Sequence, residues 1–370
     1  MDLSGPQQGR PLVPARNVRV SGYAELHALT NFSFLWGASH PEELVETAAG
    51  LGYAALAITD ECSVSGVVRA HVAAKEHDLG KLIIGSEFRL DTGLRLVVLA
   101  RNRTGYGELC SLITGGRRAA DKGRYRVTAD DFSTGLPNCL VLWLPDNQLL
   151  LGADDAWILD AFRQRLWIAV ELLADGLESI RLTRLQHLGE DLGLSLVASG
   201  DVHMHCRERR ALQDTVTAIR EGVTLDRAGF ALYPNGERYL RPRPVLAGIY
   251  PPALLDETLQ IAGAIQFSLD ELRYEYPDEL VPAGETPPTY LRRLTEKGMQ
   301  KRWPGGVPDK VAALVEHELR LIRELAYEPY FLTVYDIVAY ARSQGILCLL
   351  YTSPSPRDRS RDLVCRLVLV

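Results

Sequence analysis

The chain has 370 residues, enough for two or more domains, and its composition of 46% apolar and 24% charged residues is typical of globular proteins. No apolar run reaches the roughly 18 residues that a membrane-spanning helix needs, so the sequence predicts no membrane association. The net charge of −6 argues against a protein that binds nucleic acid with its whole surface, but it does not exclude a local basic groove. The six cysteines form no C-x-x-C pair, which indicates reduced thiols and a cytoplasmic protein.

The first 200 residues alternate between short β-rich runs and helical segments, after an arm rich in Pro, Gly and Arg at residues 1–20 that we expect to be flexible. Most of the runs are continuous aliphatic stretches, which is typical of strands buried on both faces of a largely parallel sheet. Asp91-Thr92-Gly93, between two alternating runs, predicts a local hairpin. The candidate strands are residues 23–28, 54–60, 81–90, 94–101, 138–145, 165–173 and 194–203. The pattern predicts an α/β fold, either a barrel or a doubly wound sheet.

Helix signals lie between the strands and continue beyond them. At residues 39–52, Ser39 as the N-cap and Glu42 three residues later form a predicted capping box. The proline-rich stretch at residues 274–288 predicts a domain boundary, and the long amphipathic helices beyond it begin a second domain. A basic stretch at residues 101–126 either contacts phosphate or forms a solvated helix and loop face, of which the second is the simpler interpretation.

Side chains that can bind metal follow four of the predicted strands. Because the carboxyl ends of parallel strands meet at one edge of a sheet or barrel, we expect these side chains to converge. Carboxylates and imidazoles together suit zinc, manganese or iron. The candidate ligands are His27, Asp60, Glu61, Glu87, Asp201 and His203. The sequence therefore predicts a metal site built from several strand ends.

At these residues the sequence resembles a known family. The segments "YAELHALTNFSFLWGAS", "ALAITDECSVSGVVRAH", "IIGSEFRL", "VASGDVHMH" and "NGERYL" are similar to the successive motifs of the polymerase-and-histidinol-phosphatase (PHP) domain of bacterial C-family DNA polymerases. These segments are most similar in sequence to the error-prone, damage-inducible branch of that family. The resemblance covers about residues 21–348. It implies a PHP-type distorted (β/α)7 barrel followed by the start of the polymerase palm, an α+β unit.

The resemblance also implies how the chain is divided. Residues 21–273 would form the PHP domain with a helical extension, and residues 274–348 the truncated start of the palm. Beyond residue 348 the similarity stops, and "LLYTSPSPRD" resembles translated sequencing-adapter sequence. We therefore interpret residues 349–370 as a non-native tail.

Departures from the family pattern affect the metal site directly. An intact PHP site begins His-x-His, but here Leu29 follows His27 at the second position, and Trp36 stands where the family has an aspartate. The family's Thr-Asp-His reads Thr-Asp-Glu and ends at Glu61. Leucine and tryptophan offer a metal no lone pair. The resemblance thus implies a degenerate site that has lost ligands at Leu29 and Trp36. His205 is a candidate replacement, although a loop histidine outside the site is the simpler interpretation.

The resemblance implies that the parent protein is an error-prone DNA-directed DNA polymerase, a nucleotidyltransferase acting in translesion synthesis during DNA replication and repair. Its expected requirements are DNA, deoxynucleoside triphosphates and Mg²⁺, and its expected partners are the sliding clamp and accessory mutagenesis proteins. The fragment alone should not polymerise, because the palm aspartates are absent; Asp336 is interpreted as an N-cap or core-edge residue. For the PHP domain we favour a structural scaffold. The alternative is a metal-dependent phosphoesterase or 3′–5′ exonuclease that binds Zn²⁺ or Mn²⁺.

Overall fold

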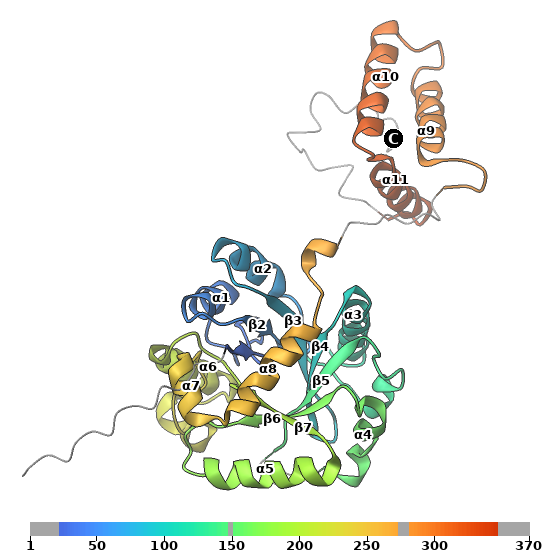
Figure 1. Ribbon diagram of the computed structural model, residues 1–370. Helices are drawn as coiled ribbons and strands as arrows, with labels where there is room; N and C mark the ends of the chain where they lie inside the picture. The colour runs from blue at the N-terminus through green and yellow to red at the C-terminus, as the bar shows by residue number, and fades with distance from the viewer. Residues whose placement is uncertain (1–21, 147–150, 273–280, 347–370) are drawn as a thin grey trace, which may run out of the picture. The chain divides into compact units, whose positions relative to one another are not determined.

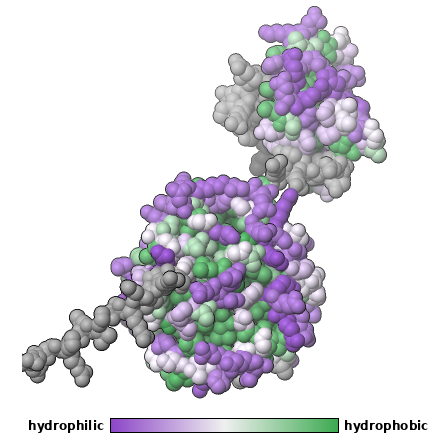
Figure 2. Space-filling view, viewed as in Figure 1, coloured by the Kyte–Doolittle hydropathy of each residue, from purple (hydrophilic) through white to green (hydrophobic). Residues whose placement is uncertain are grey.

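The computed structural model describes residues 22–146, 151–272 and 281–346 (Figure 1). The chain divides into two compact units, Met1–Leu272 and Arg273–Val370. The predicted arm and the predicted non-native tail lie outside the described residues. Within the described residues no helix combines the length and the apolar character that crossing a membrane requires. In the view of Figure 2, hydrophilic residues predominate along the periphery of the first unit.

The first unit is built on seven strands that pair in chain order from β1 to β7. Strand β4 runs antiparallel to both of its neighbours, and all the other pairs are parallel. The predicted hairpin at residues 91–93 is confirmed, since it joins β3 to β4. The strands are β1 (Ala24–Glu25), β2 (Ala55–Ile58), β3 (Leu82–Arg89), β4 (Arg95–Ala100), β5 (Cys139–Trp143), β6 (Leu166–Glu171) and β7 (Ser195–Ser199).

The segments that follow β1 and β7 meet and bring the sheet to near closure. Ala28 and Val202 form a parallel bridge, in which the Leu29 amide donates to the Val202 carbonyl at 2.8 Å. The Val202 amide in turn donates to the His27 carbonyl at 3.0 Å. The structure therefore confirms the barrel of the two α/β alternatives that the strand pattern left open. It also brings the carboxyl ends of β1 and β7 together.

The barrel interior is filled by small and aliphatic side chains. Helix α8 (Pro252–Ala264) lies across the strands (Figure 1), and its Ile261 and Ala262 belong to the same buried cluster as the interior residues. Lys81, which directly precedes β3, donates to the carbonyls of Ala262 and Ile265 at 2.8 Å each and so caps the carboxyl end of α8. This helix closes the amino-terminal end of the barrel. The interior strand residues include Ala24, Leu26, Ala57, Ile83, Val97, Leu142 and Val197.

Helices cover the outside of the barrel and make up the second unit. The outer helices of the first unit are α1 (Pro41–Gly50), α2 (Val67–Glu76), α3 (Arg103–Arg118), α4 (Trp157–Phe162), α5 (Glu178–Leu192), α6 (Arg210–Arg220) and α7 (Arg243–Ile249), and α8 is Pro252–Ala264. The second unit contains α9 (Pro287–Arg302), α10 (Asp309–Glu324) and α11 (Glu328–Ser343). Their shared core includes Leu291, Leu294, Val315, Leu319 and Leu332.

The predicted capping box of α1 is wrong by one residue. His40 is the N-cap, and its backbone amide donates to the Glu43 carboxylate at 2.8 Å. The Ser39 hydroxyl, which the sequence pattern assigned to the cap, lies 2.8 Å from Nδ1 of His205 instead. The Ser39 side chain therefore bonds to a residue far away in the sequence and not to the amino terminus of α1.

A buried carboxylate replaces part of the backbone ladder between β1 and β7. Oε1 of Glu25 accepts hydrogen bonds from the amides of Leu26 and His27 at 3.1 Å each and of Gly200 at 3.0 Å. Oε2 accepts from the Tyr23 hydroxyl at 2.8 Å. Burial raises the pKa of Glu25. A Cβ atom on Gly200 would lie 2.3 Å from Oε2, so only glycine leaves room for this carboxylate.

The contact of Gly200 with Glu25 predicts the effect of adding one methyl group. Gly200→Ala should lower the free energy of unfolding by about 1–3 kcal/mol, the usual cost of forcing an extra group into a packed interior. Urea denaturation followed by circular dichroism would measure it. Gly248→Ala in α7 is the matched control, because a Cβ there meets nothing within 4 Å. Equal stability of the two variants would contradict the assigned role of Gly200.

Candidate functional site

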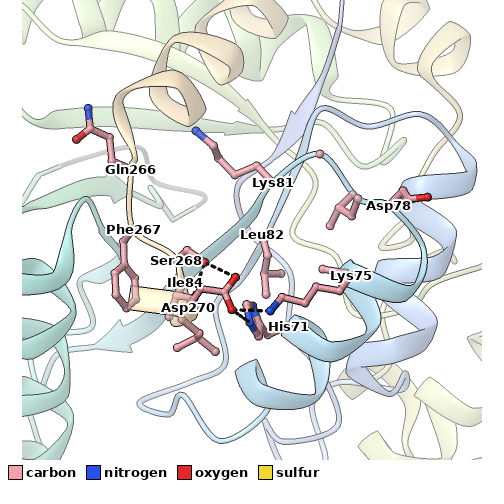
Figure 3. Close-up of a pocket in the computed structure, with 14 residues that line it drawn as sticks. His71, Lys75, Asp78, Lys81, Leu82, Ile84, Gln266, Phe267, Ser268 and Asp270 are labelled. Carbon is pink, nitrogen blue, oxygen red and sulfur yellow. Dashed lines mark hydrogen bonds and ion pairs between the residues drawn. The ribbon is translucent and has the colours of Figure 1, made fainter. Parts of the chain in front are cut away.

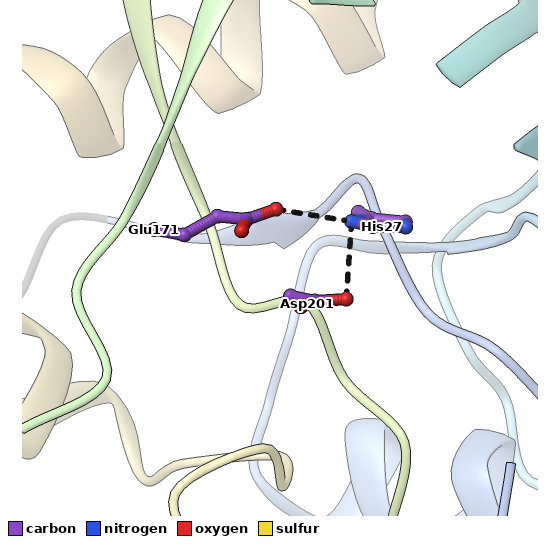
Figure 4. A group of neighbouring side chains, drawn as sticks. All are labelled: His27, Glu171 and Asp201. Carbon is purple, nitrogen blue, oxygen red and sulfur yellow. Dashed lines mark ion pairs between the residues drawn. The ribbon is translucent and has the colours of Figure 1, made fainter. Parts of the chain in front are cut away.

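Four acidic or imidazole side chains meet at the carboxyl end of the barrel. Nε2 of His27 lies 3.0 Å from Oε2 of Glu87, which lies near the carboxyl end of β3. Nδ1 of His27 lies 3.5 Å from Oε1 of Glu171 on β6 and 3.7 Å from Oδ1 of Asp201, which follows β7 (Figure 4). One ligand atom from each of His27, Glu171 and Asp201 falls within 4.8 Å of the others, a spacing that a metal ion could bridge.

Glu171 was missed by the sequence-based prediction. It is the last residue of β6 and projects into the same mouth as the expected ligands. The signal was present in the sequence, since a carboxylate follows the aliphatic run "LWIAV". The strand was predicted to continue to residue 173, so Glu171 did not look like a strand end.

Two arginines occupy positions beside the carboxylates. Nε of Arg95, at the start of β4, donates to Oε1 of Glu87 at 2.8 Å. The Arg238 guanidinium forms an ion pair with Oδ2 of Asp201 and lies over the Tyr233 ring, 4.2 Å from its centroid. Because β4 is antiparallel to its neighbours, its first residue lies at the carboxyl end of the parallel strands. The hairpin therefore delivers Arg95 to the site.

The cationic groups balance the carboxylates. Burial alone would lower the pKa of His27, but its interactions with Glu171 and Glu87 outweigh burial and raise the pKa to about 9. Burial would likewise raise the pKa of Glu87, yet the charges of Arg95 and His27 hold it well below its usual range. Burial lowers the pKa of Arg238 to about 10, so this guanidinium is still charged at neutral pH. Three cations, His27, Arg95 and Arg238, thus face three carboxylates, Glu87, Glu171 and Asp201.

His203 belongs to the same group but carries no charge at neutral pH. Its Nε2 lies 3.1 Å from Oδ1 of Asp201, and its ring meets Tyr233 edge to face at 5.4 Å between centroids. Burial and the positive charge of His27 lower the pKa of His203 to about 3.

Asp60 and Glu61 have partners of their own. The Asp60 carboxylate accepts hydrogen bonds from the backbone amide and the hydroxyl of both Thr30 and Ser33, at 2.7–3.2 Å. Burial raises its pKa. Asp60 thus fixes the loop after β1 and lies outside the group around His27. Glu61 lines the cavity beside the site, where Oε1 accepts from the Tyr125 hydroxyl at 2.7 Å.

The positions where the family pattern predicted lost ligands are apolar. Leu29 and Trp36 line a cavity of about 210 Å³ together with Glu87, Asp201 and His203. On its other side the Trp36 ring packs beneath the Arg220 guanidinium, which lies 3.6 Å from the ring centroid.

His205 is bonded outside this cavity. Its Nδ1 lies 2.8 Å from the Ser39 hydroxyl and 3.8 Å from the Glu43 carboxylate. Its Nε2 lies 3.2 Å from the sulfur of Cys206. His205 therefore does not replace the histidine that the family pattern has at the position of Leu29.

The donor set does not fit a divalent metal as it stands. A metal would have to displace the proton that His27 holds at neutral pH, because only the neutral imidazole offers a lone pair. Glu87 and Asp201 are engaged by arginines, whose positive charges would repel a cation placed between them. The distances between the possible ligand atoms of His27, Glu171 and Asp201 would suit a metal ion. The charges around them are already balanced by Arg95 and Arg238.

A larger cavity of about 530 Å³ lies at the opposite end of the barrel, between α2 and the segment after α8 (Figure 3). Oδ1 of Asp270 lies 3.2 Å from Nε2 of His71 and 2.5 Å from Nζ of Lys75. These contacts fasten the segment after α8 to α2. We interpret this cavity as structural.

Comparison with known proteins agrees with the fold. The sequence pattern of the PHP domain matches residues 25–136, and that of the bacterial DNA polymerase III alpha NTPase domain matches residues 289–349. An error-prone DNA polymerase of Methylococcus capsulatus is 61% identical over 331 residues, which are 88% of this chain and 31% of that protein. Residues 25–136 thus carry a PHP domain, and most of the chain is similar to the amino-terminal third of error-prone DNA polymerases.

Further relatives have the same pattern of coverage. The error-prone DNA polymerase of Dechloromonas aromatica is 59% identical over 88% of this chain and 32% of that protein, and that of Pseudomonas aeruginosa 54% over 90% and 32%. The chain thus spans about a third of the length of these relatives. Among solved structures, an amidohydrolase from Chromobacterium violaceum aligns with 49% of this chain and 88% of its own at 16% identity. Its TM-score of 0.36 is too low to carry a functional argument.

The raised pKa of His27 predicts how the stability of the PHP domain depends on pH. The folded protein binds a proton at His27 more tightly than the unfolded chain does, so the contribution is complete below pH 6.5 and is lost as pH rises to about 9. It amounts to about 3 kcal/mol at most. The groups that face His27 are Glu87, Glu171, Asp201 and, through Glu87, Arg95.

Urea denaturation at a series of pH values would measure this effect. His27→Gln should flatten the decline of stability between pH 6.5 and 9, whereas the exposed control His187→Gln should leave it unchanged. The same decline in the wild type and in His27→Gln would contradict the assignment of a charged His27.

Proposed function

We propose that the chain is part of an error-prone DNA-directed DNA polymerase, which transfers nucleotides from deoxynucleoside triphosphates with Mg²⁺ during translesion synthesis after DNA damage. The high identity to error-prone polymerases over most of this chain supports the proposal. The match of residues 289–349 to the polymerase III alpha domain supports it independently. The sliding clamp and accessory mutagenesis proteins are the proposed partners, and the cytoplasm the proposed location. The 370 residues alone would not polymerise.

Within that polymerase the PHP domain would act as a structural scaffold. The observation that carries this proposal is the pairing of Arg95 with Glu87 and of Arg238 with Asp201. A metal-dependent hydrolase works by holding metal ions that lower the pKa of bound water and clamp the reacting oxygens. Here guanidinium groups neutralise two of the carboxylates that would hold such ions. A guanidinium neither coordinates water as a Lewis acid nor lowers its pKa in that way.

The same contacts explain how the group would stabilise the barrel. Glu87 lies two residues before the end of β3, Arg95 begins β4, and Glu171 ends β6. His27 and Asp201 follow β1 and β7. The ion pairs therefore link five of the seven strands at one end of the barrel. Removing one partner of a buried ion pair leaves an uncompensated charge and costs about 3–5 kcal/mol. A scaffold that depends on these pairs would lose much of its stability with any one of them.

Metal binding and hydrolysis would distinguish the scaffold from a phosphoesterase or 3′–5′ exonuclease. The wild-type chain should hold clearly less than one equivalent of Zn²⁺ or Mn²⁺. It should also hydrolyse neither a p-nitrophenyl phosphodiester nor a 3′-labelled oligonucleotide with either metal. Metal analysis and product assays would be run on the wild type, on Asp201→Ala/His203→Ala, and on the exposed control His187→Ala/Asp191→Ala. Metal-dependent hydrolysis that the first double variant abolishes and the control retains would establish the hydrolase alternative.

The polymerase proposal has its own test in a protein of the relatives' length that carries this chain. It should extend a primed DNA template with Mg²⁺ and insert nucleotides opposite a damaged base. In that protein Asp201→Ala/His203→Ala should keep primer extension at low temperature but lose it at a lower temperature than the wild type, because the substitutions weaken the scaffold and leave nucleotidyl transfer intact. Absence of primer extension by the wild type would sink the polymerase proposal.

A further inference from the structure

A group of exposed cations lies beside the mouth of the barrel, at the end of β3 and in the segment that begins at the carboxyl end of α3. We call it the basic rim; its residues are Arg89, Arg118, Lys122, Arg124 and Arg126, all of them exposed. Between residues 117 and 126 the only acidic residue is Asp121. In a chain with a net charge of −6, this is a strong local reversal of sign.

The cations of the basic rim are not neutralised by neighbours. Among the described residues, no ion pair joins any of the five to a carboxylate, whereas some exposed cations elsewhere are paired, such as Arg69 with Glu42 and Lys75 with Asp270. Unpaired like charges in close sequence repel one another and weaken the fold slightly. Such an arrangement is expected where an anionic partner supplies the missing charge.

The loop that carries the basic rim is held in place by contacts that leave its cations free. Arg117 donates to the carbonyls of Cys62 and Glu61 at 3.1 Å each, and its guanidinium lies 5.4 Å from the Tyr125 ring centroid. The Tyr125 hydroxyl donates to Glu61 at 2.7 Å and accepts from the Arg89 amide at 3.0 Å. Arg117 and Tyr125 thus fix the loop against the barrel, and Arg118, Lys122, Arg124 and Arg126 are exposed on it, while Arg89 lines the neighbouring cavity.

An open groove of about 420 Å³ along α3 leads to the basic rim. It is lined by Cys110, Ser111, Thr114, Gly115 and Arg118. Small side chains and hydroxyl groups make its walls, and a Cβ on Gly115 would meet nothing within 4 Å. An extended chain can therefore lie close to the helix, beside the Ser111 hydroxyl and with Arg118 at one end; the Thr114 hydroxyl donates within the helix to the Cys110 carbonyl at 2.8 Å.

We propose that the basic rim and the α3 groove bind the phosphate backbone of DNA without reading its sequence. The inference rests on the proposed polymerase function, which brings DNA to this molecule. Arginine and lysine side chains with small hydroxyl residues contact phosphate and sugar and carry no base specificity. The central anchors of a protein interface are commonly large aromatic side chains. Between Val72 and Leu177 no described large hydrophobic side chain is exposed, so this surface offers none.

Binding of labelled oligonucleotides to the 370-residue chain, measured by fluorescence anisotropy at several salt concentrations, would test the proposal. The variant is Arg118→Gln/Lys122→Gln/Arg124→Gln. The matched control is Arg163→Gln/Arg184→Gln/Arg227→Gln, which removes three exposed and unpaired cations from other surfaces. For single-stranded DNA, loss of three phosphate contacts should reduce the slope of log affinity against log salt by about 2, and for duplex DNA by about 3. The control should retain the wild-type slope.

Three outcomes would overturn the proposal: no binding by the wild type at low salt, the same slope in the rim variant and the wild type, or an equal loss in the control. Binding of a polyglutamate peptide that competes equally with DNA would show general attraction of anions and would also overturn it. The larger reduction in slope for single-stranded or for duplex DNA identifies the form that the rim contacts. Failure of the polymerase proposal would appear separately, as absence of primer extension.

Discussion

The buried ion pairs at the carboxyl end of the barrel are the constraint on which the rest of the first unit depends. His27, Glu87 and Asp201 are fully enclosed, and a charge in such a place is tolerated only with a partner of opposite sign. The partners come from different strands, so each strand end must hold its position for the others to stay paired. The closure of β1 against β7, the carboxylate of Glu25 and the space beside Gly200 all serve this arrangement.

A metal ion and an arginine solve the same electrostatic problem in different ways. Converging carboxylates repel one another unless cations lie between them, and a divalent ion or two guanidinium groups can supply that charge. Neutralisation of the carboxylates by arginine does not depend on the supply of metal or on the protonation state of each ligand. It also abolishes the activation of water that a metal provides. In the scaffold that we propose, apolar Leu29 and Trp36 and the charges of Arg95 and Arg238 together suit a structural centre.

The sequence predicted the strands well because aliphatic runs and the hairpin at residues 91–93 are local signals. It also brought His27, Glu87, Asp201 and His203 to one site, because strand ends of parallel strands converge. What it missed depends on distant residues. The Asp60 carboxylate accepts hydrogen bonds from Thr30 and Ser33 in the loop after β1. The Ser39 hydroxyl bonds to His205, so that His40 becomes the N-cap of α1. Arg95 and Arg238 drew no attention because arginine is not a metal ligand.

The arginines of the first unit show that position, and not residue type, decides what a cation does. Arg95 and Arg238 lie within the barrel mouth, where their charges are consumed by carboxylates and contribute to the fold. Arg89 lies directly opposite Arg95 in the same hairpin and lines the same cavity, but it is exposed, and no ion pair joins it to a carboxylate among the described residues. An unpaired exposed cation gains no stabilisation from an ion pair and keeps its full attraction for an incoming anion. The same hairpin therefore supplies one arginine to the internal ion pairs and another to the surface that we assign to DNA.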